Sequence, residues 1–192
     1  MEMRASLLWL LMMTGLFGVN TVGYADSEIA NLTFTAEFVG GGCSISVPDS
    51  IPFNHGNALF AADIEHGNAA TTETFNLTLS ECSGWGLTPS IKVSGQTTTE
   101  FGLPLYLNPP STMAANGYGL LLSTAGNSTF AGNGNLAASP TIVANNWDTT
   151  TELESVVTSL PMTAQLSCGQ CNSAGRHGGV FNATVTFEFV YE

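Results

Sequence analysis

The chain has 192 residues, of which three are lysine or arginine and fifteen are aspartate or glutamate, so its formal net charge is −12. Beyond residue 5 the only cations are Lys92 and Arg176, too few for the basic surface that nucleic acids or anionic membranes require. Hydrophobic residues make up 44% of the chain, which excludes a disordered protein. Its 21 glycines and 8 prolines favour one domain with many turns.

Residues 1–25 are predicted to form a secretory signal peptide. One cation at Arg4 precedes the apolar run 5–19, and Gly23 and Ala25 supply the small residues expected before a cleavage site. The alternative, a membrane anchor, needs about 20 apolar residues, and Asn20 ends the run too early. The mature chain is therefore expected to begin at residue 26 and to be exported.

Alternation of apolar and polar residues dominates the mature chain and predicts β-strands with one buried face. The segments that show it are 30–38, 75–79, 91–93, 160–166 and 181–191. Turn sequences such as Asn-Gly and Asn-Pro-Pro separate them. Several short strands joined by turns in a chain of this size predict an all-β antiparallel sandwich.

The four cysteines are Cys43, Cys82, Cys168 and Cys171. An even number of cysteines in an exported chain favours disulfides over metal or redox chemistry. The residues alone leave three connectivities open. Cys168 and Cys171 have the C-x-x-C spacing of redox enzymes, but no helix follows to activate a thiolate, so a structural disulfide in a loop is favoured.

Other candidate chemistry has little support in the sequence. The histidines are His55, His66 and His177. No two have the spacing of metal ligands, even with Asp63 or Glu65 as a third ligand. Glu152 and Glu154 could flank a glycosidic bond, but nothing in the sequence sets their separation. We therefore expect no enzyme activity, no metal and no cofactor.

The segment 26–38 is unusual for the start of a mature chain, because chain ends are mostly polar and poorly ordered. Its apolar face comprises Leu32, Phe34, Ala36 and Phe38. Such a face needs a sheet to join. The segment is either the first strand of its own sandwich or a strand donated to the exposed sheet edge of another molecule.

These features together resemble a bacterial chaperone–usher fimbrial subunit, a pilin of the type-1-fimbria class. The resemblance covers the whole mature chain. An extension beginning Asp26-Ser27 precedes Cys43-Ser44-Ile45, and the segment 75–82 ends in Cys82. Gly179, the fourteenth residue from the end, and the penultimate aromatic Tyr191 complete the pattern.

The resemblance implies an incomplete immunoglobulin-like sandwich (39–192) that lacks its seventh strand and is completed by a donated one. A periplasmic chaperone would lend that strand first, and the extension 26–38 of the next subunit would replace it at the outer-membrane usher. The donor face would be the four apolar residues named above. The acceptor groove and chaperone contact would comprise Gly179, Phe181, Ala183, Val185, Phe187, Phe189 and Tyr191.

The resemblance also implies a Cys43–Cys82 disulfide, the first of the family. Cys168 and Cys171 are expected to pair because they lie so close in sequence; most subunits lack this pair. A second departure is Ala36, which stands where the family usually has glycine, seven residues before the first cysteine.

The expected function is a structural subunit of an adhesive surface fimbria, in transit through the periplasm and then extracellular, with neighbouring subunits as partners. The alternative is an adhesin- or invasin-like subunit that binds host glycans through loops such as Trp85-Gly86 or Asn145-Asn146-Trp147. A third possibility, a secreted glycosidase, lacks an identifiable pair of catalytic carboxylates.

Overall fold

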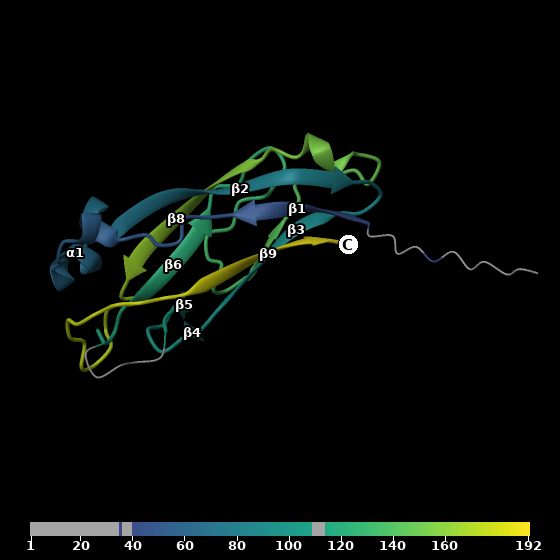
Figure 1. Cartoon of the computed structure of the whole chain (residues 1–192). Helices are drawn as coiled ribbons and strands as arrows, with labels where there is room; N and C mark the ends of the chain where they lie inside the picture. Colours follow the sequence, from purple (N-terminus) through teal and green to yellow (C-terminus); the bar gives the residue numbers. More distant parts are fainter. Residues whose placement is uncertain (1–34, 36–39, 109–113) are drawn as a thin grey trace, which may run out of the picture. The chain divides into compact units, whose positions relative to one another are not determined.

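A computed structural model describes residue 35 and residues 40–108 and 114–192 (Figure 1). The expected signal peptide and the donor residues Leu32, Phe34, Ala36 and Phe38 lie outside the described residues. The described residues from 40 to 192 belong to one unit.

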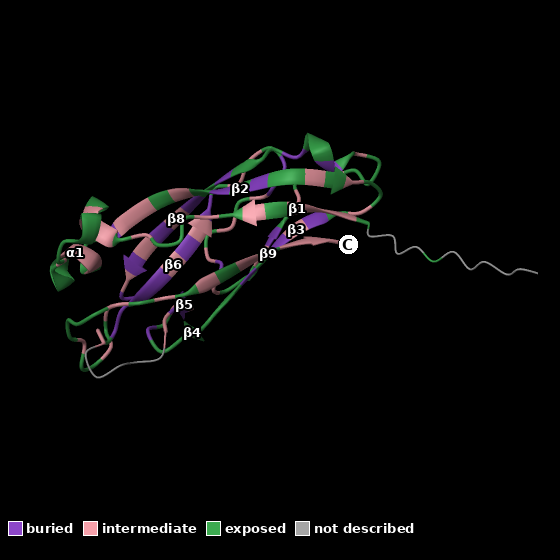
Figure 2. Ribbon diagram, in the orientation of Figure 1, coloured by how far each residue is buried: buried purple, intermediate pink, exposed green. Residues whose placement is uncertain are grey.

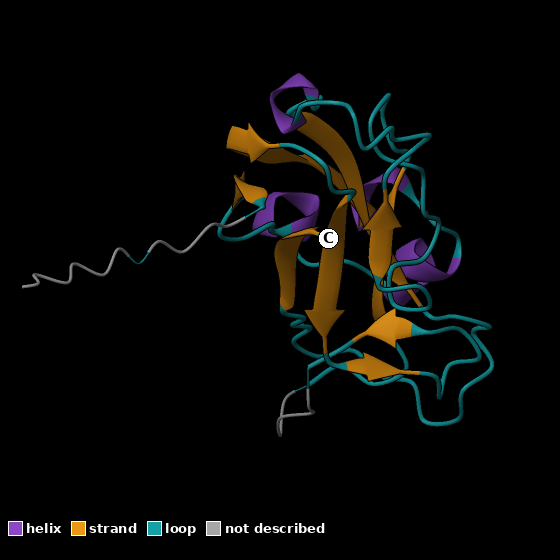
Figure 3. Ribbon diagram, turned by 90° about the vertical axis from the view of Figure 1, so that its right-hand side faces the viewer, coloured by secondary structure: helices purple, strands orange, loops and turns teal. Residues whose placement is uncertain are grey.

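Two antiparallel sheets form the sandwich (Figure 3). The larger sheet has the order β1 (Gly41–Ser46), β2 (Thr72–Gly84), β8 (Ser159–Ser167), β6 (Gly119–Thr124), β5 (Leu105–Tyr106) and β4 (Thr97–Thr98). The smaller sheet has the order β7 (Thr141–Val143), β3 (Pro89–Gly95) and β9 (Val185–Tyr191). The short helices are α1 (Ala61–Glu65) and three 3-10 turns, η1 (Phe53–Gly56), η2 (Ala69–Thr71) and η3 (Leu153–Ser155). The predicted all-β antiparallel sandwich is confirmed.

The core lies between the sheets and follows the alternation predicted from the sequence. On β8 the inward side chains are Leu160, Met162, Ala164 and Leu166, and all four are buried. Figure 2 shows this burial along β8 and β6, whereas the residues of β9 are half-buried or exposed. The strands that supply the core are thus the ones whose period-2 pattern is clearest.

The last strand begins later than the sequence predicts. Alternation starts at Phe181, but β9 starts at Val185. Its hydrogen-bonding partner β3 ends at Gly95, which lies opposite Val185. Residues 181–184 therefore keep an alternating, half-buried face without a β3 neighbour, because sheet structure requires a partner as well as a pattern.

The strand β1 begins at Gly41, inside a run of three glycines that shows no strand pattern. It pairs with β2, and two residues of β2, Glu81 and Cys82, lie opposite the single Cys43. Glu81 has a positive φ of 53°, as expected where a β-bulge inserts one extra residue. The bulge brings Cys82 beside Cys43.

Candidate functional site

An apolar groove of about 850 Å³ runs beside the C-terminal segment of the chain. One wall is the stretch from Val47 to Ile64, which leaves the sheet after β1. The other wall is the stretch from Gly178 to Phe187, which leads into β9. The groove therefore separates two segments that are far apart in sequence but lie on either side of an opening between the sheets.

The larger sheet forms the floor of the groove. Its lining side chains are Phe75 on β2, Leu120 and Leu122 on β6, and Ala164 and Leu166 on β8. Phe75 meets the ring of Phe187 edge-to-face, with 6.5 Å between ring centroids. The floor is thus continuous with the hydrophobic core, so a side chain that entered the groove would be packed as if in the core.

The structure brings together most of the residues that the sequence suggested as acceptors. Gly179, Phe181, Ala183, Val185 and Phe187 all line the groove. Phe181 to Phe187 alternate between half-buried inward residues and exposed outward ones. The wall therefore presents four apolar side chains at a spacing of two residues, and the glycine precedes them.

Two of the suggested residues, Phe189 and Tyr191, are half-buried but do not line the groove. A Cβ atom placed on Gly41 would lie 3.0 Å from the Tyr191 ring, and one on Gly84 would lie 2.8 Å from it. The Tyr191 hydroxyl accepts a hydrogen bond from the Leu87 backbone N–H (3.4 Å). This end of β9 is packed against β1 and β2, so the groove ends near Phe187.

One edge of β9 faces the groove. Within residues 40–108 and 114–192, β9 forms strand pairing only with β3. Backbone N–H and C=O groups on the edge of a sheet are a template for another strand. The site thus combines apolar pockets with a sheet edge, which suits an extended peptide better than a compact ligand.

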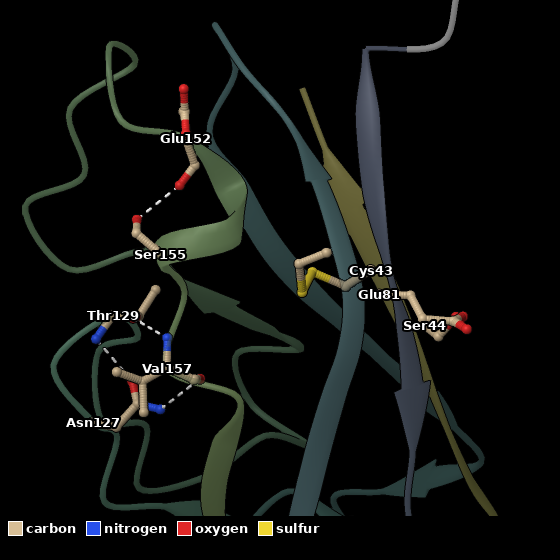
Figure 4. Close-up of a disulfide and its surroundings, with 9 residues drawn as sticks. Cys43, Ser44, Glu81, Asn127, Thr129, Glu152, Ser155 and Val157 are labelled. Carbon is tan, nitrogen blue, oxygen red and sulfur yellow. Dashed lines mark hydrogen bonds between the residues drawn. A yellow bond between two sulfur atoms is a disulfide. The ribbon is translucent and has the colours of Figure 1, made fainter.

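The disulfide Cys43–Cys82 joins β1 to β2. Figure 4 shows this disulfide with Ser44 and Glu81 nearby. The Ser44 hydroxyl donates a hydrogen bond to the Glu81 carboxylate (2.8 Å). The bridge fixes the start of β1, and the groove wall begins at Val47, just after this strand. Cross-linking these strands restricts the unfolded chain, and a loop of this size stabilises a fold by about 4 kcal/mol on the chain-entropy estimate.

The second disulfide, Cys168–Cys171, closes a tight loop after β8. Gly169 has a φ of 61°, and a Cβ atom there would lie 2.1 Å from the Phe101 carbonyl oxygen. The next N–H, from Gln170, donates to that same oxygen (2.8 Å). Only glycine permits such a close approach, so the loop is packed tightly against the turn at Phe101.

Arg176 ties this disulfide loop to the groove. Its guanidinium donates to the Cys171 carbonyl oxygen and forms an ion pair with Glu65 at 3.0 Å. The side chains of Arg176 and Glu65 are 24% and 33% exposed, so water screens the pair only in part. Glu65 follows Ile64 at the end of one wall and Arg176 precedes Gly178 at the start of the other, so the pair joins the two walls at the α1 end.

The surroundings of the groove contain one strongly perturbed side chain. Tyr106 is 1% exposed, and its hydroxyl donates to the Leu136 carbonyl oxygen (2.7 Å). Burial raises the pKa of Tyr106 to about 12, because the charged phenolate is disfavoured away from water. This hydroxyl points to a structural partner, so its role is packing rather than chemistry.

Comparison with known proteins decides the family. A family model described as fimbrial protein matches residues 32–192, most of the chain. This chain belongs to the fimbrial protein family. No curated protein sequence matches it.

Two solved structures are similar to this fimbrial subunit. The P pilus rod subunit PapA shares 19% identity, with a TM-score of 0.43, over 84% of this chain and all of that one. A chaperone–usher pilus structure that concerns rod uncoiling shares 16% identity, with a TM-score of 0.45, over 86% of this chain and 96% of that one.

Family membership makes the chain a structural fimbrial subunit, not an enzyme. Its three histidines, His55, His66 and His177, are exposed. In the part of the chain that the structure describes, no three His, Cys, Asp or Glu residues gather as metal ligands would. None of the helices described is long and apolar enough to cross a bilayer.

Sequence reasoning missed two features of this site. The segment 47–64 shows no strand pattern, yet it supplies a whole wall. Arg176 and Glu65 pair across the groove, and nothing in the sequence relates them except that Arg176 is one of two late cations. Of the two tryptophans suggested for sugar binding, Trp147 packs against the core, whereas Trp85 is exposed.

Proposed function

We propose that this subunit is polymerised by donor-strand exchange, in which the extension 26–38 of one copy fills the groove of the next. The observation that carries the proposal is the groove itself, with an alternating apolar wall and an accessible edge of β9. The boundaries proposed from the sequence, 1–25, 26–38 and 39–192, then become a cleaved signal, a donor and an acceptor domain.

The dimensions of donor and groove support this pairing. The donor residues Leu32 to Phe38 and the wall residues Phe181 to Phe187 both span seven residues, or about 20 Å in a strand. Each carries four apolar side chains at alternate positions. A seven-residue donor therefore reaches from one end of the alternating wall to the other.

The direction of the donor follows from the sheet it would join. Every pairing between named strands in this fold is antiparallel. A donor antiparallel to β9 would place Phe38 beside Phe181 at the α1 end, and Leu32 beside Phe187. Ala36 would then lie beside Ala183, so the smallest apolar side chain of the donor would be next to the smallest apolar side chain of the wall.

An unfilled groove exposes apolar surface and a strand edge, both of which promote aggregation. A periplasmic chaperone that supplies a temporary strand would protect the subunit until an outer-membrane usher exchanges that strand for the next extension. The assembled fimbria would lie outside the cell and contribute to adhesion. The residues Gly179 to Phe187 are the proposed acceptor, and Phe189 and Tyr191 extend the surface for the chaperone.

Deletion of residues 26–38 from the mature chain tests the proposal. The shortened subunit should still co-purify with its chaperone, because its own groove is intact. It should not be incorporated into another subunit's groove, and filaments should be absent when it is the only subunit. A shortened subunit that polymerises normally would exclude the donor role.

A further inference from the structure

The two most exposed large hydrophobic side chains among the described residues are Phe60, which is 78% exposed, and Trp85, which is 65% exposed. Single exposed apolar residues are common on protein surfaces. These two differ because each sits on a backbone held by hydrogen bonds, and because they lie at opposite ends of the sandwich. Phe60 precedes α1 at one end, and Trp85 follows β2 at the other (Figure 1).

The indole of Trp85 is held in one orientation. Its Nε1–H donates to the Thr150 carbonyl oxygen (3.1 Å), and the neighbouring Gly86 N–H donates to the Thr149 carbonyl oxygen (3.1 Å). Trp147 donates its indole N–H in the reverse direction, to the Leu87 carbonyl oxygen (3.0 Å). A ring that is already fixed loses little conformational entropy when a partner covers it.

Trp85 lies beside the point at which the chain enters the sandwich. Gly84 pairs with Gly41 across β1 and β2, and a Cβ atom on Gly40 would lie 2.5 Å from Leu87 Cδ1. The turn that carries Trp85 is therefore packed directly against Gly40 and Gly41.

This position limits where a neighbouring copy can be, provided that the proposed donor-strand exchange holds. The donor face ends at Phe38, two residues before Gly40. Two residues of extended chain span at most about 7 Å. The copy whose groove holds Phe38 must therefore lie against the turn that carries Trp85.

The antiparallel direction of the donor selects the surface of that neighbouring copy. Phe38 would lie at the α1 end of the groove, and Phe60 stands on the rim at that end, between the lining residues Leu59 and Ala61. The Phe60 N–H donates to the Asp63 carboxylate (3.1 Å), and the Asp63 N–H donates to the Phe60 carbonyl oxygen (3.0 Å). The backbone beneath the exposed Phe60 ring is thus fixed.

We infer that Trp85 of one copy packs on Phe60 at the groove rim of the copy that receives its extension. The contact joins two different surfaces of the same chain. Such a head-to-tail interface builds a filament when its rotation does not close into a ring. It also explains why both rings are exposed in a single copy, because each is covered only by a neighbour.

Photo-cross-linking in assembled filaments tests the contact. The full chain carries p-benzoylphenylalanine in place of Trp85, and cross-linked peptides are identified by mass spectrometry. We expect cross-links to the segment 57–66 of a second copy, recognised by mixing copies with natural and heavy nitrogen. Cross-links confined to the same copy, or to another segment of the neighbour, would overturn the inference.

Substitutions give an independent readout. Trp85→Ala and Phe60→Ala should each speed the dissociation of filaments in urea about tenfold, and the double variant should be no faster than either alone. Val143→Ala, which truncates another exposed side chain, is the matched control and should leave the rate unchanged. Additive effects of the two substitutions, or unchanged dissociation rates, would overturn the contact. Binding to an oligosaccharide array that depends on Trp85, with unchanged filament dissociation, would also overturn it.

The two proposals fail in different ways. If the chain lacking 26–38 still forms filaments, donor-strand exchange is wrong and the contact loses its basis. If that deletion abolishes filaments while Trp85→Ala and Phe60→Ala leave their dissociation unchanged, donor-strand exchange stands and only the contact is wrong.

Discussion

Truncation of Phe187 should lower the free energy of unfolding by more when a donor strand fills the groove than when the groove is empty. Phe187 is half-buried and meets Phe75 edge-to-face. Removing a fully buried phenylalanine side chain costs about 3–5 kcal/mol, so a half-buried ring should cost about 2 kcal/mol. A donor strand would complete its burial, which raises the cost of Phe187→Ala to about 4 kcal/mol. The difference, about 2 kcal/mol, corresponds to roughly thirtyfold weaker donor binding.

The assay is urea denaturation of the subunit lacking 26–38, with and without a synthetic peptide of that sequence, followed by tryptophan fluorescence. The matched control is Ile91→Val, which removes one methylene from a fully buried side chain on β3 that does not line the groove. Its cost, about 1 kcal/mol, should be equal with and without the peptide.

Equal costs for Phe187→Ala in the two conditions would refute this reasoning. The peptide would then bind elsewhere, or would leave the ring as exposed as before. A larger difference for Ile91→Val than for Phe187→Ala would also contradict it, because the peptide would then stabilise the core in general rather than the groove.

Three further predictions concern other parts of the chain. Tyr191→Ser should abolish the chaperone complex, because Tyr191 packs at the end of β9. Phe34→Ser should preserve that complex and block polymerisation. Co-purification with the chaperone and filament yield distinguish the two variants. Tyr106 has its pKa raised by burial to about 12, while an unfolded tyrosine ionises near pH 10. The free energy of unfolding should therefore fall by about 2 kcal/mol between pH 10 and pH 12, and urea titrations of Tyr106→Phe should lack this slope. Arg176→Met and Glu65→Gln should each lower the free energy of unfolding by about 1 kcal/mol and accelerate amide hydrogen exchange in residues 57–66. The double variant should be little less stable than either single variant.

The sequence predicted the strands whose two faces differ most. On β8, alternation from Leu160 to Leu166 matches the buried face of the strand, because one face meets the core and the other meets water. The strand β6 was not predicted, since Leu120, Leu121 and Leu122 form a continuous apolar run without a polar face to mark its period.

The start of β9 shows a different limit. The residues from Phe181 to Thr184 have a strand pattern, but their hydrogen-bonding partner on β3 has already ended. A pattern records which side chains are buried and says nothing about which strand is available for pairing. The mismatch falls in the wall of the groove, and the proposed donor strand would pair with the other edge of this segment, opposite to the β3 side.

The site was partly predictable. The proposed acceptor residues from Gly179 to Phe187, which line the groove, follow from the alternation and the resemblance to fimbrial subunits. The opposite wall, 47–64, and the Arg176–Glu65 pair depend on how the chain returns across the sandwich. Long-range contacts of this kind are set by topology and leave no local trace in the sequence.

The most direct test of the central claim is whether the extension of one copy occupies the groove of another. Subunits with p-benzoylphenylalanine at position 34 are prepared with natural and with heavy nitrogen, mixed, assembled and irradiated. Donor-strand exchange predicts cross-links from position 34 to residues 178–187, and in half of these pairs the two peptides carry different isotopes. Cross-links that always join peptides of the same isotope would contradict the account, because the extension would then be a strand of its own sandwich.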